Sequence, residues 1–224
     1  MKKYKKINML LSIDYFKTLW FNFKAFDFKT AMLFPVILGY GIKAKLAGKI
    51  RICGKVRFGM VKLGLSGSND LKYYEQNKSY FSVEDGGVLT FSDNNNIGRH
   101  FSILCRGEMV LGRNFSCNDG CVFSCTKSIK IGDDVLFGGQ ITVRDSNGHE
   151  IMYKQENIGN RGEKNIVIGN HVWVCNKSDL LRGTNIENNT VIAYRSLCNK
   201  HYQANSLVAG CPAKVCRENI LWKK

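Results

Sequence analysis

The chain has little proline and no long hydrophobic run, and its first quarter is almost free of acidic residues. Only 2 prolines occur in 224 residues, so the composition excludes a proline-rich linker and a collagen-like chain. The longest uncharged, mostly apolar run, residues 30–42, is well short of the roughly 20 residues that a membrane-spanning helix needs. Residues 1–64 contain 14 Lys and Arg against two acids, Asp14 and Asp27. Most of the net charge of +15 therefore belongs to the N-terminal quarter.

The sequence also lacks an export signal, because the basic segment 1–6 is not followed by a cleavable apolar stretch. The 9 cysteines are odd in number and scattered over a chain too long to be a disulfide miniprotein. We therefore expect a cytoplasmic protein with reduced thiols. A chain that is 44% hydrophobic and 23% charged is not disordered and can bury a core.

The C-terminal third contains an internal repeat. An aliphatic residue recurs every six positions, at Ile168, Val174, Leu180, Ile186 and Ile192. Four residues after each comes a small or short branched residue, at Val172, Ser178, Thr184, Thr190 and Ser196. A period of six matches neither the 3.6 of a helix nor the alternation of a strand. It predicts a coil with flat sides, whose short strands turn corners and stack in parallel on the next coil.

The same pattern appears in interrupted form before the repeat. Each restart opens with an aliphatic residue followed by glycine, at Ile97-Gly98, Leu111-Gly112, Ile131-Gly132 and Ile168-Gly169. In this register Cys117 and Cys121 take two inward positions, which predicts small core residues and not metal ligands. The segment 144–164 has no six-residue register and is polar. Long irregular segments on a rigid scaffold are usually functional.

Outside the repeat, residues 12–33 predict a helix with aromatic residues at helical spacing. Basic–apolar alternation over 43–64 predicts strands that lead into the coils. We therefore expect an N-terminal unit at 1–64 and a coil domain at 65–216 with an active-site loop at 144–167. Residues 217–224 are expected to form a short C-terminal helix or tail.

Three segments together resemble a known family: Asp-Ser-Asn-Gly-His at 145–149, Ile-Gly-Asn-His-Val-Trp-Val at 168–174 and Ala-Gly-Cys-Pro-Ala-Lys at 209–214. They resemble the hexapeptide-repeat acetyltransferases, and among these the polysaccharide O-acetyltransferases, over about 97–222. The resemblance implies an all-β-dominated fold, a left-handed parallel β-helix, and a homotrimer with active sites between neighbouring subunits. It also implies acetyl-CoA as the donor, no metal, and a sugar hydroxyl of a bacterial-type surface polysaccharide or its precursor as the acceptor.

His149 is the candidate general base. Transfer of an acyl group from a thioester to an alcohol requires an acceptor for the hydroxyl proton, and imidazole has a suitable pKa near neutrality. Asp145 and Glu150 are the nearby carboxylates that can orient the ring, and we favour Asp145. The alternative is an ordinary solvent-exposed loop histidine.

The resemblance implies further site residues. It places coenzyme A contacts at Asn176, Tyr194, Asn199, Lys214 and Arg217. The charges of Lys214 and Arg217 suit the phosphates of the coenzyme. For the acceptor it implies Asn118, with Asp119 beside it, and Trp173 is interpreted as a packing residue that flanks the active-site wall.

Two alternative functions and several readings of the basic N-terminus stay open. A non-catalytic β-helix scaffold would explain the bulky Tyr194, and a zinc hydratase would need three of the four histidines around one metal. No recognition motif accompanies the basic charge, so nucleic-acid binding is not expected. We favour a peripheral membrane contact through residues 1–34 at the inner membrane surface. The alternatives are a solvated charged face, packing on the end of the β-helix, or a subunit interface.

Overall fold

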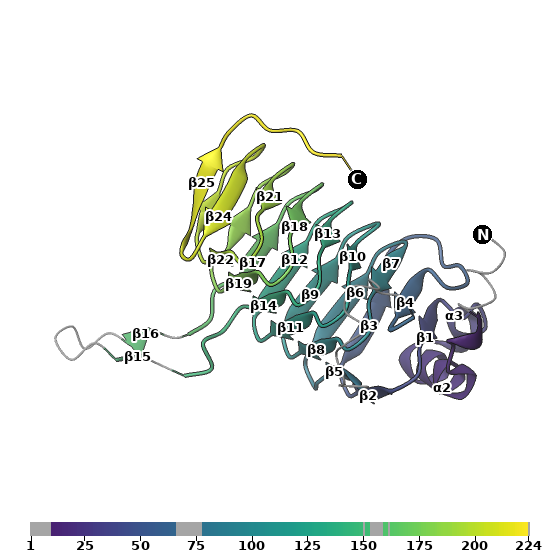
Figure 1. The fold of residues 1–224 in the computed structure, drawn as a ribbon. Coiled ribbons are helices and arrows are strands. Elements are labelled where there is room, and N and C mark those ends of the chain that lie inside the picture. Colours follow the sequence, from purple (N-terminus) through teal and green to yellow (C-terminus); the bar gives the residue numbers. More distant parts are fainter. Residues whose placement is uncertain (1–9, 66–77, 150, 153–158, 161, 224) are drawn as a thin grey trace.

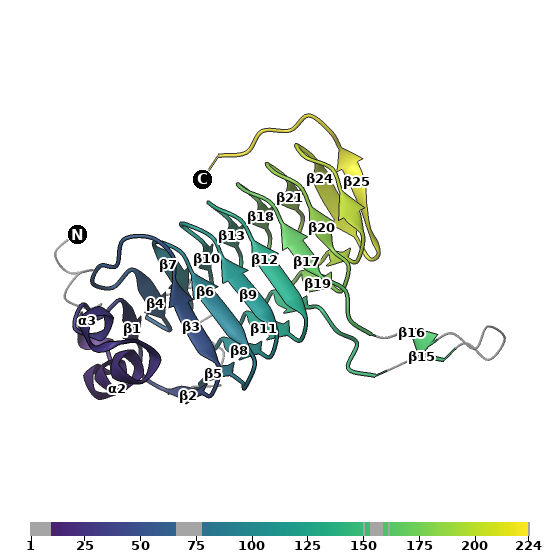
Figure 2. The ribbon, with the colours of Figure 1, turned by 180° about the vertical axis from the view of Figure 1, so that it is seen from behind.

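The computed structural model of the chain describes residues 10–65, 78–149, 151–152, 159–160 and 162–223. Within these ranges the chain winds into a prism with three walls of short strands, with two helices at its N-terminal end (Figures 1 and 2). Apart from β25, the last strand of wall 1, the strands of each wall pair in parallel with those of the coils before and after them, and this is the left-handed parallel β-helix that the family resemblance implies.

The walls are numbered in the order in which the chain meets them. Wall 1 consists of β1 (Val36–Leu38), β4 (Val61–Leu63), β7 (Asn95–Ile97), β10 (Ser116–Cys117), β13 (Leu136–Phe137), β18 (Trp173–Val174), β21 (Val191–Ile192), β24 (Leu207–Gly210) and β25 (Ala213–Arg217). Wall 2 consists of β2 (Ile42–Leu46), β5 (Ser79–Val83), β8 (Ser102–Cys105), β11 (Val122–Cys125), β14 (Thr142–Arg144), β19 (Asp179–Leu181) and β22 (Leu197–Cys198). Wall 3 consists of β3 (Lys49–Ile52), β6 (Val88–Phe91), β9 (Glu108–Leu111), β12 (Ser128–Ile131), β17 (Ile166–Ile168), β20 (Asn185–Ile186) and β23 (His201–Tyr202).

The six-residue repeat forms the core, as predicted. All five aliphatic residues of the repeat, and the five small residues that follow them, are buried. The buried hydroxyl groups are satisfied by carbonyls of the next coil: Ser178 Oγ donates to Ala193 O at 3.0 Å, and Thr184 Oγ1 to Cys198 O at 2.8 Å. Cys117 and Cys121 also point inward, at 2% and 0% exposure. The period therefore identifies the interior correctly along the C-terminal coils.

The glycine that opens each restart is required by the distance between coils. A Cβ atom on Gly132 would lie 2.5 Å from Asn170 Oδ1 and 2.7 Å from the carbonyl carbon of Gly169 on the next coil. The corresponding Cβ on Gly112 would lie 2.3 Å from the carbonyl oxygen of Gly132. Any side chain at these positions would force two coils apart, so the corner needs glycine for its small size.

The N-terminal helix is broken in two, which differs from the single helix predicted over 12–33. α2 (Tyr15–Ala25) is capped by Asp14, and α3 (Phe28–Ala31) by Asp27, whose side chain accepts from Thr30 N. This second cap starts a new helix because an aspartate in extended conformation satisfies the free amides of a first turn. Phe21 of α2 enters the core and meets the ring of Phe81 at 5.3 Å. α2 thus covers the open N-terminal end of the prism.

The boundaries at both ends also differ from those predicted. The β-helix begins at Val36 instead of residue 65, because β1, β2 and β3 already belong to the three walls. At the other end, residues 213–223 contain no helix: β25 turns back and pairs antiparallel with β24, and an extended tail follows. Among the described residues, no helix combines the length and the apolar character that a membrane crossing requires.

Candidate active site

His149 lies on an excursion that leaves the prism between walls 2 and 3. The chain departs after β14 and returns at β17, and in Figure 1 the excursion projects away from the walls with the short antiparallel pair β15 (Ile151–Met152) and β16 (Gly159–Asn160). Three backbone contacts tie its base together: Lys164 N donates to Asp145 O at 3.0 Å, Ser146 bridges Glu163, and Asn147 N donates to Gly162 O at 2.9 Å. We call residues 145–147 and 162–164 the stalk. His149 follows the stalk directly and is exposed.

The turn before His149 is compact and lies beside a cation. Gly148 has φ +79°, a left-handed conformation that favours glycine, and its N–H donates to Ser146 Oγ at 3.0 Å. A Cβ on Gly148 would lie 3.1 Å from Nη2 of Arg144. The guanidinium of Arg144 is therefore next to the backbone that carries the histidine. The sequence analysis did not single out Arg144, although its position at the start of the irregular segment is a signal for it.

Asp145 does not orient His149 in this structure. Its carboxylate is fully buried and accepts three backbone N–H groups of the preceding coil, from Thr126 at 2.8 Å, Lys127 at 2.7 Å and Ser128 at 2.8 Å. Among the described residues, no hydrogen bond joins it to His149. The carboxylate therefore fixes the base of the stalk, and Glu150, the other predicted candidate, lies outside the described residues.

The position of Asp145 explains its burial. Arg144 pairs with Ser124 on the preceding coil, so Asp145 comes next to Cys125. Cys125 in turn pairs with Cys105 one coil earlier, and the three residues form one inward column of wall 2. The hydrogen bond with Cys105, burial, and the nearby Asp145 carboxylate all raise the pKa of the Cys125 thiol. This column therefore places two thiols next to one carboxylate whose oxygens accept three backbone N–H groups.

The predicted acceptor residues Asn118 and Asp119 lie at the corner between walls 1 and 2. Asp119 is 1% exposed and accepts from Arg99 N at 2.7 Å and from Arg99 Nη2 at 2.9 Å. Asn118 is half-buried, and its backbone packs over Gly98 of the coil below. Asp119 therefore holds two coils together, and only Asn118 of the pair has a side chain that reaches solvent.

Two of the predicted coenzyme contacts, Asn176 and Tyr194, lie at the same corner one coil apart, as predicted from the repeat. Asn176 Oδ1 accepts from Gly139 N at 3.0 Å, so this side chain fastens its corner to the coil below. Tyr194 is 55% exposed, and Lys177 Nζ lies 6.0 Å from its ring centroid. Lys177 and Arg195 occupy equivalent left-handed positions, at φ +61° and +54°, and both are exposed. The sequence analysis missed this basic pair, although each member directly follows a predicted contact.

The remaining predicted coenzyme contacts lie elsewhere. Asn199 is exposed at the corner between walls 2 and 3. It directly follows β22, which stacks through β19 on β14, and the stalk begins directly after β14, so both lie on the same edge of the prism. Lys214 and Arg217 are exposed on β25 at the C-terminal end of wall 1. No ion pair between described residues uses either of these two side chains.

The predicted residues therefore form two groups at opposite edges of wall 2. His149 and Asn199 lie at the edge shared with wall 3, and Asn118, Asn176 and Tyr194 lie at the edge shared with wall 1. About five extended residues separate the edges, which corresponds to about 17 Å. Within one chain, His149 and the corner that carries Lys177 and Arg195, which we call the basic corner, lie on different edges of the prism.

Trp173 takes part in an aromatic cluster on wall 1. It is 37% exposed, and its ring lies 5.9 Å from that of Trp222 in the C-terminal tail. Trp222 stacks on His171 at 4.1 Å and donates from Nε1 to His171 O at 2.9 Å. The tail is thus held against the last coils, and Trp173 packs beside it with one side exposed; a place for Trp173 next to the active site stays a prediction.

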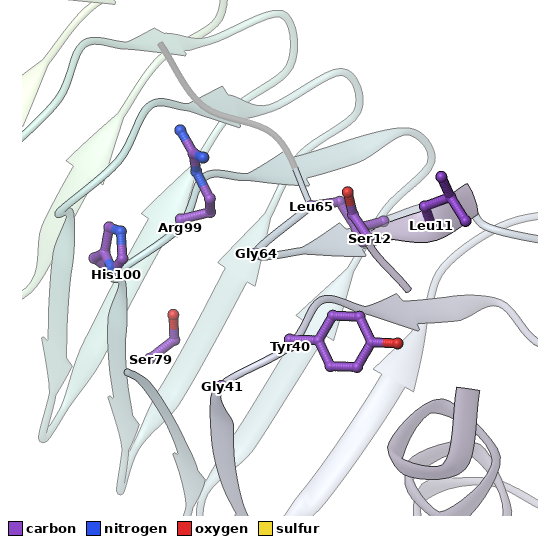
Figure 3. A pocket seen from close by; sticks show the side chains of 9 residues that line it. All are labelled: Leu11, Ser12, Tyr40, Gly41, Gly64, Leu65, Ser79, Arg99 and His100. Atoms are coloured by element: carbon purple, nitrogen blue, oxygen red, sulfur yellow. The ribbon is translucent and has the colours of Figure 1, made fainter. Parts of the chain in front are cut away.

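A cavity of about 570 Å³ lies at the wall 1–wall 2 corner near the N-terminal end (Figure 3). Arg99 and His100 line one side of it, and Tyr40 lies on the other. It contains none of the predicted site residues and touches them only through the pair Arg99–Asp119. Two of its lining residues, Leu65 and Ser79, flank a stretch outside the described residues, so we assign it no ligand.

The zinc alternative finds no cluster in the described part of the chain. There, no group of three His, Cys, Asp or Glu side chains is arranged to hold a metal ion. His171 stacks on Trp222, and His201 Nε2 lies 2.9 Å from Glu187 Oε1.

Comparison with known proteins gives relatives of one kind. No family model matches the chain. A protein of Escherichia coli K12 described as a putative lipopolysaccharide biosynthesis O-acetyl transferase, WbbJ, is 26% identical over 156 residues, which is 63% of this chain and 80% of that protein. Galactoside O-acetyltransferase of the same organism is 32% identical over 108 residues, which is 48% of this chain and about half, 53%, of that enzyme.

A solved structure supports the same fold. The polySia-specific acetyltransferase NeuO matches with a TM-score of 0.54 at 22% identity, over 85% of this chain and 89% of that one. At this level of identity the match concerns the architecture alone. The sequence relatives are O-acetyltransferases, and in sequence and in coil architecture the chain is similar to the hexapeptide-repeat O-acetyltransferases, which supports acyltransferase activity.

Proposed function

We propose that the chain transfers an acetyl group from acetyl-CoA to a hydroxyl of a sugar in a surface polysaccharide or its precursor, with His149 as the general base. The observation that carries the proposal is the stalk. It holds the exposed imidazole of His149 outside the prism, and the hydrogen bonds of the buried Asp145 carboxylate fix its base. The names of the sequence relatives, which concern lipopolysaccharide biosynthesis and a galactoside, support a sugar acceptor. A donor of this kind places the reaction in the cytoplasm.

His149 handles one proton in two steps. It accepts the proton of the sugar hydroxyl while the hydroxyl oxygen forms a bond to the thioester carbonyl carbon. It then returns the proton to sulfur as the carbon–sulfur bond breaks, so the ring ends the cycle neutral. Arg144 lies beside the Gly148 backbone and supplies a positive charge close to the reacting groups. Asp145 acts as a positioning residue, because its hydrogen bonds hold the base of the stalk and not the ring.

The residues at the other edge of wall 2 fit a polyanionic coenzyme. Acetyl-CoA supplies the activated acyl group. The exposed side chains Lys177, Arg195, Lys214 and Arg217 can bind its phosphates, since each is free of ion pairs within the described residues. Tyr194 presents a ring beside Lys177 at the same corner.

The separation of the two groups supports a site shared between copies of the chain. A single copy keeps the base of the stalk and the corner that carries Lys177 and Arg195 at opposite edges of wall 2, about 17 Å apart. In a homotrimer of parallel prisms, the wall 2–wall 3 edge of one copy can face the wall 1–wall 2 edge of its neighbour. The complete site then needs His149 from one copy and Lys177 and Tyr194 from the next.

Mixing two impaired variants, assayed at an acetyl-CoA concentration well below the raised KM, tests this proposal. His149→Ala is expected to lower the rate of acetyl transfer by about 10²–10⁴, because it removes the general base. Lys177→Glu combined with Arg195→Glu is expected to raise the KM for acetyl-CoA. When the two variants are co-expressed in equal amounts, half of the chains have an intact His149 and the other half have intact Lys177 and Arg195. Random assembly should therefore give a complete site at roughly a quarter of the subunit interfaces, with activity in proportion. The measurements are thiol release from acetyl-CoA and the mass of the acetylated glycan.

The control is co-expression of His149→Ala with itself, which carries no intact histidine and should stay inactive. Full activity in His149→Ala alone would remove the general base from the proposal. Absence of recovery in the mixture, when each variant alone forms the same assembly, would place the whole site within one chain.

A further inference from the structure

The helix α2 is apolar on two opposite sides. One side faces the prism, where Thr18, Phe21 and Asn22 are buried. The other side faces solvent and carries large apolar residues: Tyr15, Phe16, Leu19, Trp20 and Phe23 are 59%, 90%, 48%, 46% and 38% exposed. An isolated amphipathic helix would turn its polar side outward. Phe21 thus packs on the end of the β-helix, whereas these five residues stay exposed on the opposite side of the helix.

The exposed residues form one continuous face. At about 100° per residue, the five residues from Tyr15 to Phe23 fall within an arc of about 140° on the side opposite Phe21. The face continues onto neighbouring residues, where Leu11, Phe28 and Met32 are 73%, 70% and 52% exposed. We call these eight residues the aromatic face. Aromatic side chains present about 150–250 Å² each, so the face exposes several hundred Å², at or above the largest apolar patch of an ordinary monomer.

Basic residues greatly outnumber acids in this part of the chain. The described part of the first quarter, residues 10–64, contains ten Lys and Arg and two acids. Both acids cap helices: Asp14 accepts from Lys17 N at 3.0 Å and Asp27 from Thr30 N at 3.2 Å. The exposed Lys24 and Lys29 lie on α2 and α3 next to the aromatic residues, and neither takes part in an ion pair with a described residue.

The position of the face suits a flat partner. α2 and α3 lie at the N-terminal end of the prism, beyond β1, while the β24–β25 hairpin lies at the other end (Figures 1 and 2). The excursion that carries His149 leaves from the side of the prism, away from this end. Contact of the aromatic face with a surface therefore leaves the stalk accessible.

We infer that the aromatic face binds the surface of a lipid bilayer that contains anionic lipids. Phe, Tyr and Trp side chains insert at the boundary between headgroups and acyl chains, and lysines at the rim of the face attract negative headgroups. Charge complementarity favours this partner over a second copy of the face, because two copies would bring two strongly basic ends together. The inference stands apart from the acetyl-transfer proposal, since no residue of the face belongs to the candidate active site.

Vesicle flotation with the full chain tests this inference. The native chain is expected to float with vesicles of phosphatidylcholine and phosphatidylglycerol, and weakly or not at all with phosphatidylcholine alone. Phe16→Ser combined with Trp20→Ser should lower the partition into anionic vesicles at least about tenfold. Lys24→Glu combined with Lys29→Glu should also lower it, and added salt should weaken binding of the native chain.

The matched control is Tyr80→Ser, which removes an aromatic residue of similar exposure, 50%, from the outer side of wall 2. This variant should float like the native chain. Unchanged thermal unfolding of all variants shows that they fold, as expected for exposed side chains. Equal flotation of the Phe16/Trp20 variant and the native chain overturns the inference. So does a smaller assembly mass of that variant in light scattering, which would make the aromatic face an interface between copies.

Discussion

Two corners of the β-helix use the same type of side chain for different purposes. At the corner between walls 3 and 1, the six coils from β6 onward each place an Asn, Asp or His in a left-handed conformation. Hydrogen bonds link these side chains from coil to coil in a ladder: Asn94 to Asn114, Asn114 to Asp134, His171 to Asn189, and Asn189 to Asn205. At the corner between walls 2 and 3, Asp145 turns inward and accepts three amides of the coil below. The first corner closes each coil, and the second fixes the point where the chain leaves it.

The difference lies in burial and in the number of partners. The ladder side chains are short, local links, and several of them reach solvent. Asp145 is fully buried, and its three donors would all lose their partner if the carboxylate were removed. Replacing one polar residue of the ladder should therefore lower the free energy of unfolding only slightly. Replacing Asp145 should lower it more, because Asp145 fixes the segment that leaves the prism. Three variants measure this contrast.

Asp145→Ala should have the largest effect on stability. Three buried N–H groups lose a charged acceptor, and we expect the free energy of unfolding to fall by at least about 3 kcal/mol. Denaturant unfolding followed by circular dichroism measures the change. Asp134→Ala is the comparison in the ladder, where the exposed carboxylate accepts from Asn114 Nδ2 at 2.7 Å, and it should cost about 1 kcal/mol. Equal losses in the two variants would remove the distinction between the corners.

Gly132→Ala should have an intermediate effect, because its methyl group would meet the next coil. The predicted Cβ distance of 2.5 Å to Asn170 Oδ1 requires two coils to move apart, and we expect a loss of about 2 kcal/mol. Gly86→Ala is the matched control: its Cβ would meet nothing within 4 Å, although its φ of +77° is left-handed. That control should cost about 1 kcal/mol. A greater loss in Gly86→Ala would show that backbone conformation, and not coil spacing, sets the need for glycine.

Asp133→Asn should have the smallest effect, and one that depends on pH. The hydrogen bond from Arg113 lowers the pKa of Asp133, so the folded state binds a proton less readily than the unfolded state. The stabilisation is present above the ordinary carboxylate pKa and is lost as the pH falls through the lower folded value. The free energies of unfolding of the variant and the native chain should differ by less than about 1 kcal/mol near neutrality and converge in acid, once the pH falls below the lowered pKa of Asp133. If the two free energies of unfolding still differ in acid, the effect of the substitution comes from packing and not from the charge of Asp133.

The fold could be predicted from the sequence because the coil imposes its own period. Ile168, Leu180 and Ile192 point inward for the same geometric reason, so a spacing of six reveals the walls without other information. The start of the β-helix was missed because β2 and β3 carry alternating lysines, which are typical of any half-exposed strand. The break between α2 and α3 depends on one capping aspartate, Asp27, inside an otherwise continuous aromatic pattern.

The candidate site could be predicted only in part. His149 was identified by its place in the irregular segment and by a family resemblance, and its role stays a prediction. The inward position of Asp145 follows from the spacing of twenty that links Cys105, Cys125 and Asp145, a register that the sequence analysis did not extend into the loop. The separation of the two groups across wall 2 could not be foreseen, because a linear motif does not show which edge of a prism each corner occupies.

The antiparallel turn of β25 onto β24 has a further consequence. A stack of parallel coils has no intrinsic end, since each coil offers its successor the same row of backbone donors and acceptors. β25 takes up the last row of wall 1 with a strand of opposite direction and presents the charged side chains of Lys214 and Arg217 along its length. A further parallel coil therefore cannot pair with β24, just as α2 covers the core at the opposite end of the prism.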